Sequence, residues 1–289
     1  MTTGAGTNPR AVPPLFAQLV DDTSLLRPKA SAPAVDAVVS RYLAARKGRH
    51  GGLVGQLGCP VSRLPALVAE LARAAPTPPV DLALVVDTGL GAVPKALSTV
   101  FSRASLLVPR TVETAAPPDV DGVWLERVSE FVPEDVVAVV EPRRPLARDE
   151  AAVAAWLGAV RRVAKHGCAP KLRCGGPRPS DVPSSHEVEQ FVRVAVETGR
   201  PFTVFGVRDV VRSADGRHGI LNLLVAVARA LVGEEVLPVL DSTDGKALAA
   251  ELERLSGRAV TDVRGLVSRC GADTEQPAAE QLAELGLLA

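Results

Sequence analysis

The chain has 289 residues, of which 47% are hydrophobic and 23% are charged, and its formal net charge is zero. This composition is that of a globular protein and excludes a disordered or collagen-like chain. The even charge balance, without any basic block, argues against a nucleic-acid partner. The length is usual for a single α/β barrel.

The N-terminal stretch MTTGAGTNPRAVPP is polar and rich in turn-forming residues. It lacks the apolar core of a signal peptide. No apolar run approaches the ~20 residues that a membrane-spanning helix requires. We therefore expect a cytoplasmic protein that has no membrane partner.

Short apolar runs, typical of strands buried on both faces of a parallel sheet, alternate along the chain with longer amphipathic runs. Eight strands are predicted, in the runs GLVGQLG (52–58), LALVVD (82–87), SLLVPRT (105–111), GVWLER (122–127), VVAVVEP (136–142), KLRCGG (171–176), FTVFG (202–206) and VLPVLD (236–241).

Helical spacing of apolar residues, together with capping residues, predicts helices between most of these strands. The predicted helices cover 31–48, 61–75, 91–103, 149–167, 184–199, 219–233 and 245–257, with a final helix in 275–288. The clearest case is 184–199, where Ser184 or Ser185 can cap the start and Gly199 can close the end. Ser62 is the expected cap of 61–75, and Asp149 or an adjacent residue is the expected cap of 149–167.

Eight strands alternating with helices predict a single-domain (β/α)8 barrel over 1–289, with an N-terminal helical extension (1–50) and a C-terminal helical tail (258–289) that also holds one further strand or turn. Only the segment VSEFVPED separates the fourth and fifth predicted strands. It is too short for a crossover helix. One of these strands is therefore wrong or the barrel is irregular there, and an open doubly wound sheet is the alternative.

The four cysteines form no CxxC pair, and the four histidines form no HxH or HExxH motif. Neither set has the spacing of a zinc site. We expect buried, reduced thiols, no metal and no cofactor.

The stretch APKLRCGG (169–176) is a predicted strand that nevertheless carries two cations. Side chains alternate along a strand, so Lys171 and Arg173 share one face while Leu172 and Cys174 share the other. Leucine and cysteine suit the layer between strands and helices, so the two cations should face the barrel interior, near its open end. Two glycines follow, Gly175 and Gly176, where backbone N–H groups could approach a ligand. We predict an anion site here.

Other polar residues end or interrupt predicted strands in phase with apolar interior positions. Catalytic sites of barrels lie at the carboxyl ends of the strands, so convergence of these residues on one rim predicts acid, base and binding groups. They are Gln56, Asp87, Arg110 or Glu113, Glu126, Glu141 and Asp241. The alternative is a structural ring of salt bridges that fills the barrel mouth.

The loop RSADGRHG, which follows the seventh predicted strand, offers a second candidate anion site. His218 precedes a predicted helix that starts near Gly219, and Asn222 lies one turn inside it. A helix N-terminus at this point is a common phosphate or carboxylate site in barrels. His218 could act as an acid or base, and a capping histidine on the surface is the alternative.

The segments LFAQLVDDTSLLRP, KLRCGG and HGILNLL together resemble an uncharacterised actinobacterial family of about this length. That family has a lysine in the seventh strand followed by paired histidines. This chain instead has Thr203 at the lysine position and Arg208 and Asp209 near the histidine positions.

The lysine of the sixth strand, followed by a glycine pair, is also similar to class I aldolases of the deoxyribose-phosphate type. That resemblance implies that Lys171 forms a Schiff base with a carbonyl substrate. The aldolases use a second lysine on the next strand, and Thr203 stands there in this chain.

These observations favour a barrel enzyme of the lyase or isomerase class that acts on a small anionic carboxylate or phosphate metabolite. Lys171 would be the nucleophile or proton-transfer group, Asp87, Glu141 or Asp241 the acid or base, and Arg173 an anion-binding residue. Two alternatives remain: a degenerate, non-catalytic binding or partner protein, and a biosynthetic enzyme refitted to a new substrate. The fold alone does not choose among these three functions. A homodimer is compatible with each of them.

Overall fold

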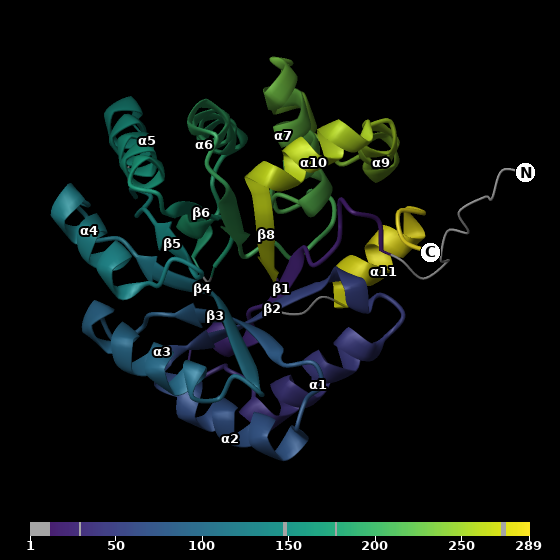
Figure 1. The fold of residues 1–289 in the computed structure, drawn as a ribbon. Coiled ribbons are helices and arrows are strands. Elements are labelled where there is room, and N and C mark those ends of the chain that lie inside the picture. Colours follow the sequence, from purple (N-terminus) through teal and green to yellow (C-terminus); the bar gives the residue numbers. More distant parts are fainter. Residues whose placement is uncertain (1–11, 29, 147–148, 177, 273–275) are drawn as a thin grey trace, which may run out of the picture.

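The structure, a computed structural model, describes residues 12–28, 30–146, 149–176, 178–272 and 276–289. Eight parallel strands close into a barrel in which each strand pairs with its neighbours in chain order and the last strand pairs with the first (Figure 1). The strands are β1 Val20–Asp22, β2 Val54–Pro60, β3 Val80–Val85, β4 Leu107–Ala115, β5 Val137–Glu141, β6 Ala169–Arg173, β7 Phe202–Phe205 and β8 Val267–Ala272.

Helices surround the strands as an outer layer (Figure 1). They are α1 Val35–Lys47, α2 Leu64–Ala74, α3 Val93–Phe101, α4 Gly122–Phe131, α5 Glu150–Lys165, α6 Ser185–Thr198, α7 Ile220–Val232, α8 Leu237–Asp241, α9 Gly245–Glu253, α10 Gly257–Leu266 and α11 Gln276–Glu284. Single 3-10 turns occur at Ser24–Leu26, Gly51–Leu53, Val61–Arg63, Leu90–Ala92 and Pro179–Asp181.

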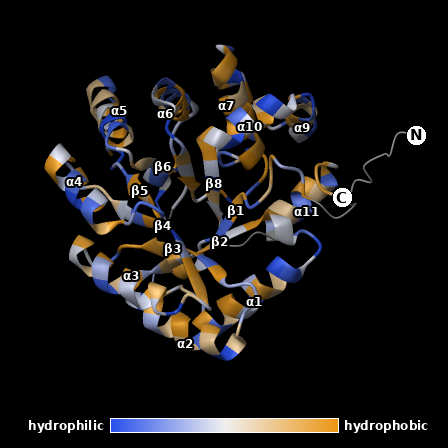
Figure 2. Cartoon of the chain, viewed as in Figure 1, coloured by the Kyte–Doolittle hydropathy of each residue, from blue (hydrophilic) through white to orange (hydrophobic). Residues whose placement is uncertain are grey.

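The hydrophobic core lies between the strands and the helices. Figure 2 shows hydrophobic residues along strands such as β3, and hydrophobic and hydrophilic residues alternating on the outer helices. Aromatic rings connect the two layers on one side of the barrel, where Trp156 of α5 stacks on Phe191 of α6 and Phe191 meets the edge of Phe202 of β7. Burial of such faces supplies most of the stability of a fold of this kind.

The predicted (β/α)8 barrel is confirmed, but two of its eight predicted strands are wrong. The run 122–127 belongs to α4, in which Asp121 caps the helix by accepting a hydrogen bond from the Trp124 N–H, and Leu125 and Val128 face the core. The crossover between β4 and β5 is this helix. The short connection between the predicted fourth and fifth strands, which made the barrel look irregular, therefore does not exist.

The run 236–241 also forms a helix, α8, with Pro238 in its first turn, where proline is well tolerated. The barrel is completed instead by β1, within the predicted N-terminal extension, and by β8, within the predicted C-terminal tail. β1 has only three residues, and both strands carry polar residues on the interior face, so their sequences lack the continuous apolar run of a buried parallel strand.

Two predicted helix caps are confirmed, and a third, Ser62, is wrong, because α2 begins after Arg63 and no side chain caps it. Ser184 caps α6, Glu187 completes the reciprocal capping box, and Gly199 closes the helix with a left-handed backbone conformation at φ 59°. Asp149 caps α5 in the same way, by accepting from the Ala152 N–H. These motifs are local, so the sequence is sufficient to predict them.

All four cysteines are free and buried. Burial raises the pKa of Cys59 and of Cys270 to about 12. In the described part of the chain, no helix is both long and apolar enough to cross a membrane.

The Asp121 cap can be tested by substitution. Asp121→Ala should lower the free energy of unfolding by about 1 kcal/mol, because the Trp124 N–H then loses its acceptor, and Asp121→Asn should restore most of it. The measurement is chemical denaturation followed by circular dichroism. Asp119→Ala, at a nearby exposed position, is the matched control, and an equal loss in that variant would contradict the capping role.

Candidate active site

A cavity of about 610 Å³ lies at the carboxyl ends of the strands. Because all eight strands are parallel, the loops that follow them meet at this one mouth. Its lining comes from the ends of β3 to β7 and from the loop after β1, and comprises Thr23, Leu26, Arg27, Pro28, Ser31, Val85, Val86, Glu113, Thr114, Ala115, Glu141, Lys171, Arg173, Gly175, Gly176, Phe205, Gly206, Val207 and Arg208.

Lys171 and Arg173 of β6 both line this cavity, whereas Leu172 and Cys174 lie in the hydrophobic core. This is the orientation that strand alternation predicts. The Lys171 side chain is only 8% exposed, and its Nζ lies 2.5 Å from Oε2 of Glu113. The ion pair therefore lies at the floor of the cavity, where water screens it little.

Glu113 reaches the floor because β4 is irregular. Leu82 of β3 is opposite Pro109 and the next residue, Ala83, is opposite Thr111, so Arg110 is the extra residue of a bulge. The bulge leaves Arg110 exposed, paired with Asp81 at 2.7 Å, and brings Glu113 inward. Arg110 therefore lies outside the lining of the cavity, away from its predicted binding position, and Glu113 occupies the interior position.

Arg173 and Glu141 form a second ion pair nearer the opening. Nε and Nη2 of Arg173 donate to the two oxygens of Glu141 at 2.6 and 2.9 Å, and the Arg173 side chain is 34% exposed. Burial would lower the pKa of Arg173, but the hydrogen bonds and charge of Glu141 outweigh it, so the pKa is raised above its ordinary value. The guanidinium is thus a permanent cation at the cavity wall.

The aromatic ring of Phe205 supports both cations. Lys171 Nζ lies 4.6 Å and the Arg173 guanidinium carbon 4.7 Å from the ring centroid. Both distances lie in the range of cation–π contacts. Phe205, at the end of β7, thereby holds the two side chains of β6 in place.

The glycine pair after β6 allows close packing of the backbone. A Cβ atom on Gly175 would lie 2.3 Å from the carbonyl oxygen of Gly206, and one on Gly176 would lie 2.2 Å from a carboxylate oxygen of Asp181. Both glycines also line the cavity. They are required for the approach of the neighbouring loops, whether or not they contact a ligand.

Four lining side chains are cationic, Arg27, Lys171, Arg173 and Arg208, whereas two are carboxylates. The chain as a whole has no net charge. The excess positive charge is therefore local to the cavity and favours an anionic ligand.

Two predicted acid or base residues, Asp87 and Asp241, and the predicted binding residue Glu126 lie outside the lining of the cavity. Asp87 follows β3 but turns outward, where it accepts hydrogen bonds from the N–H and the hydroxyl of Ser62. Glu126 is exposed on α4 and Asp241 ends α8. Both of the latter were placed on strands that are helices, so strand alternation does not apply to them.

Gln56 of β2 does point into the barrel, but below the cavity. It is buried, and its Oε1 accepts a hydrogen bond from the Thr111 hydroxyl at 2.9 Å. Its predicted contact with a ligand is not supported by this position, since it is absent from the lining of the cavity.

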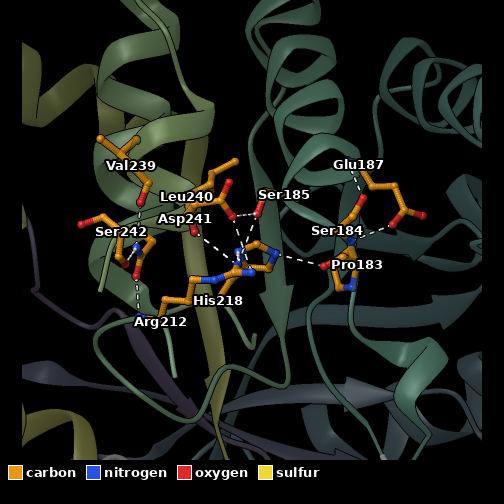
Figure 3. Close-up of polar contacts among 11 residues, drawn as sticks. Pro183, Ser184, Ser185, Glu187, Arg212, His218, Val239, Leu240, Asp241 and Ser242 are labelled. Carbon is orange, nitrogen blue, oxygen red and sulfur yellow. Dashed lines mark hydrogen bonds and ion pairs between the residues drawn. The ribbon is translucent and has the colours of Figure 1, made fainter. Parts of the chain in front are cut away.

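His218 belongs to a polar cluster between α6, α7 and α8 (Figure 3). Asn222 joins this cluster by accepting from the Arg212 N–H and donating to the carbonyl oxygens of Val239 and Ser242. His218 Nε2 lies 3.0 Å from the Pro183 carbonyl oxygen and Nδ1 lies 3.2 Å from Arg212 Nη1. A carbonyl only accepts, so Nε2 carries the proton and Nδ1 accepts from the guanidinium. His218 is buried here, outside the lining of the cavity, and this position speaks against the predicted catalytic role in the cavity.

The start of α7 is equally unavailable to a ligand. The N–H groups of Ile220 and Leu221 donate to the carbonyl oxygens of Asp209 and Val210, and a Cβ on Gly219 would lie 2.4 Å from the Val211 backbone. The Asn222 amide donates to the carbonyls of Val239 and Ser242. The predicted anion site at this helix is therefore occupied by the chain itself.

Asp241 also belongs to this cluster. Its Oδ1 accepts a hydrogen bond from the Ser185 hydroxyl at 2.5 Å and lies 3.5 Å from Arg212 Nη2 (Figure 3). Arg212 thus connects α6, α8 and the loop after β7. Its arrangement is a structural clamp beside the barrel mouth.

No protein-family model and no curated protein matches the chain. Two solved structures are similar in fold, both of dihydropteroate synthase from Xanthomonas albilineans. The form in complex with indole-2-carboxylic acid and 6-chloroguanine is 14% identical over 94% of this chain and 93% of that one, with a TM-score of 0.45. The form in complex with 7,8-dihydropteroate is 14% identical over 94% of each chain, with a TM-score of 0.44. Similarity at this level carries no information about substrate or reaction.

The environment of His218 predicts a pH-dependent contribution to stability. Burial, supported by the charge of Arg212, lowers the pKa of His218 below its ordinary value. Between the lowered pKa and the unfolded value of about 6.5, the unfolded chain binds more protons, so stability is lost as the pH falls. The free energy of unfolding of the wild type should therefore decline, relative to His218→Gln, between about pH 7 and pH 5.

Taking the difference between wild type and variant cancels the titration of distant groups. His166→Gln, at an exposed position, is the control and should show no such trend. A wild-type advantage over His218→Gln that is constant across this pH range would contradict the buried neutral imidazole.

Proposed function

We propose that the chain is a barrel enzyme of the lyase or isomerase class that binds a small organic anion in the cavity and transfers a proton on it. The observation that carries the proposal is that one cavity contains two ion pairs, Lys171–Glu113 at the floor and Arg173–Glu141 near the opening. The cavity volume of about 610 Å³ suits a small-molecule ligand.

Arg173 is the proposed anion-binding residue. Its planar guanidinium matches the geometry of a carboxylate or phosphate, and it already binds the carboxylate of Glu141 through two donors. A ligand anion would compete with Glu141 for the same donors. Arg208, an exposed cation at the rim, adds to the attraction.

Lys171 and Glu113 are the proposed proton-transfer pair. They face the ligand from the buried end of the cavity, where a proton-transfer group is shielded from bulk water. A Schiff base on Lys171 would need a neutral amine, but the adjacent Glu113 carboxylate stabilises the ammonium. The register that pairs Lys171 with Thr203 leaves no second lysine beside it. The acid–base role is therefore favoured over the covalent one.

The cavity wall between the charged groups is apolar, which indicates that the ligand has an apolar portion beside its anionic group. Leu26, Val85, Val86 and Val207 are apolar lining residues. An organic acid or phosphate ester with a short apolar portion would match both kinds of surface.

The first test separates Arg173 from Glu141. Organic acids and phosphate esters are screened by thermal shift, with the neutral amides and alcohols as comparison. Arg173→Met should weaken the binding of a hit by about tenfold to a hundredfold, since hydrogen bonds to charged groups contribute about 1.5–3 kcal/mol. Glu141→Gln should tighten binding, because the competing carboxylate is gone.

Arg161→Met is the matched control, because Arg161 forms a similar ion pair with Glu197 on the outer surface. It should leave binding unchanged. If Arg173→Met and Glu141→Gln both alter stability but neither alters anion binding, the two pairs are only a structural ring.

The second test concerns the role of Lys171. Borohydride reduction in the presence of small aldehydes and ketones, followed by mass spectrometry, should yield no adduct on Lys171. Incubation of a bound organic acid in deuterated water should exchange a carbon-bound proton, observed by NMR, and Glu113→Gln should abolish the exchange. A reduced adduct on Lys171 would instead establish covalent chemistry.

A non-catalytic binding protein is the second candidate. It is favoured by the positions of Asp87, His218 and Asp241, all of which lie outside the cavity and leave Glu113 and Glu141 as its carboxylates. Ligand binding without proton exchange in any tested organic acid would support this function.

A further inference from the structure

A second, smaller space adjoins the cavity deeper in the barrel. Its volume of about 10 Å³ is at the lower limit of what one water molecule requires. Lys171, Glu113 and Phe205 line both spaces. We call it the inner chamber, lined by Asp21, Thr23, Leu26, Gly58, Ala83, Glu113, Lys171, Thr203, Val204, Phe205, Arg269 and Gly271.

The buried hydroxyl of Thr203 lacks a protein partner in the described part of the chain, which indicates a site for a bound molecule. Thr203 is 5% exposed, and its Oγ1 finds no hydrogen-bond partner among the described residues. An unsatisfied buried hydroxyl carries a desolvation cost that a water molecule in the chamber would remove. Since Thr203 is opposite Lys171 in the sheet, that water would lie beside the Lys171–Glu113 pair.

Asp21 of β1 brings a buried carboxyl to the same chamber. Its Oδ1 accepts from the Gln56 N–H at 2.6 Å and lies 3.8 Å from Arg269 Nη1. A Cβ on Gly55 would lie 2.1 Å from this oxygen, so the glycine leaves the room that the carboxyl occupies. Both contacts with described residues use Oδ1, which leaves Oδ2 for the chamber.

The titratable and charged groups that surround Asp21 come from every adjoining element. They are Tyr42 of α1, Glu113 of β4, Lys171 of β6, Arg264 of α10, and Arg269 and Cys270 of β8. Burial is the largest influence and raises the pKa of Asp21 to about 7, against the lowering effect of Arg269. Both protonation states of Asp21 are therefore accessible near neutral pH.

We propose that one water molecule occupies the inner chamber, held by the Thr203 hydroxyl, and connects the carboxyl of Asp21 to the carboxylate of Glu113. Once Lys171 has given its ammonium proton to a bound ligand, Glu113 is a carboxylate beside a neutral amine. Asp21 then gives its proton to the water, and the water gives one of its own protons to Glu113, which passes it to the Lys171 amine. The water and the Lys171–Glu113 ion pair are restored, and the Asp21 carboxyl is left ionised.

The water site and the titration of Asp21 do not depend on the proposed function, whereas the use of this relay to supply protons to a substrate rests on it. Asp21 touches no ligand in this scheme. It acts through Glu113 and is a proton reserve for the pair.

The first measurement is a high-resolution crystal structure of the wild type and of Thr203→Val. The wild type should show an ordered water within hydrogen-bond distance of Thr203 Oγ1, and the variant should lose it while keeping the Lys171–Glu113 pair. A dry chamber in the wild type overturns the proposal, even if the variant does not fold.

The second measurement is the infrared band of protonated carboxyl groups, followed from pH 5 to pH 9. A component that titrates near pH 7 should be present in the wild type and absent in Asp21→Asn. In Thr203→Val its midpoint should rise by about 0.5–1 pH unit, because the ionised carboxyl loses its last water.

Thr198→Val is the control, since it removes a half-buried hydroxyl on α6 that bonds only within that helix and does not line the chamber. Its midpoint should equal that of the wild type. A midpoint in Thr203→Val that stays unchanged or falls overturns the relay. If instead the water and the titration are as expected but no anion binds, the proposed function fails and the hydration site stands.

Discussion

The ion pair between Lys171 and Glu113 is the interaction on which the arrangement of the barrel interior depends. Two ions with side chains 8% and 11% exposed have lost most of their hydration. Removing one partner from a buried pair typically costs about 3–5 kcal/mol, because the other charge remains without compensation. The bulge in β4, the position of Phe205 and the carboxyl of Asp21 are all arranged around this pair.

A closed parallel barrel requires that each charged side chain in its interior has a compensating partner. Half of the side chains of each strand must point inward, into a space that water barely enters. A barrel filled with branched aliphatic residues would satisfy packing alone. This one contains Lys171, Glu113, Asp21 and Gln56 instead, and each is paired or hydrogen-bonded. Such interiors are usually found where a site, and not only stability, shapes the sequence.

The two polar clusters of the protein differ in what they leave open. The cluster around Arg212 uses nearly all of its donors within the chain, and His218 is fixed there as a neutral, buried ring. The cavity cluster uses its charges in pairs but presents them to a space of about 610 Å³. The first cluster therefore holds the loop after β7 against α6 and α8, whereas the second presents its charged groups to the cavity.

The sequence by itself determined the barrel class, the helix caps at Ser184 and Asp149, and the inward orientation of Lys171 and Arg173. All of these depend on local periodicity or on contacts within a few residues. The tertiary structure decided which carboxylates meet those cations. Glu113 faces inward only because a bulge shifts β4 by one residue, and β1 and β8 become strands only because closing the barrel supplies partners on both of their edges. Asp241 and Glu126 were misplaced for the converse reason, since they lie on α8 and α4, helices whose apolar runs are too short for periodicity to distinguish from strands.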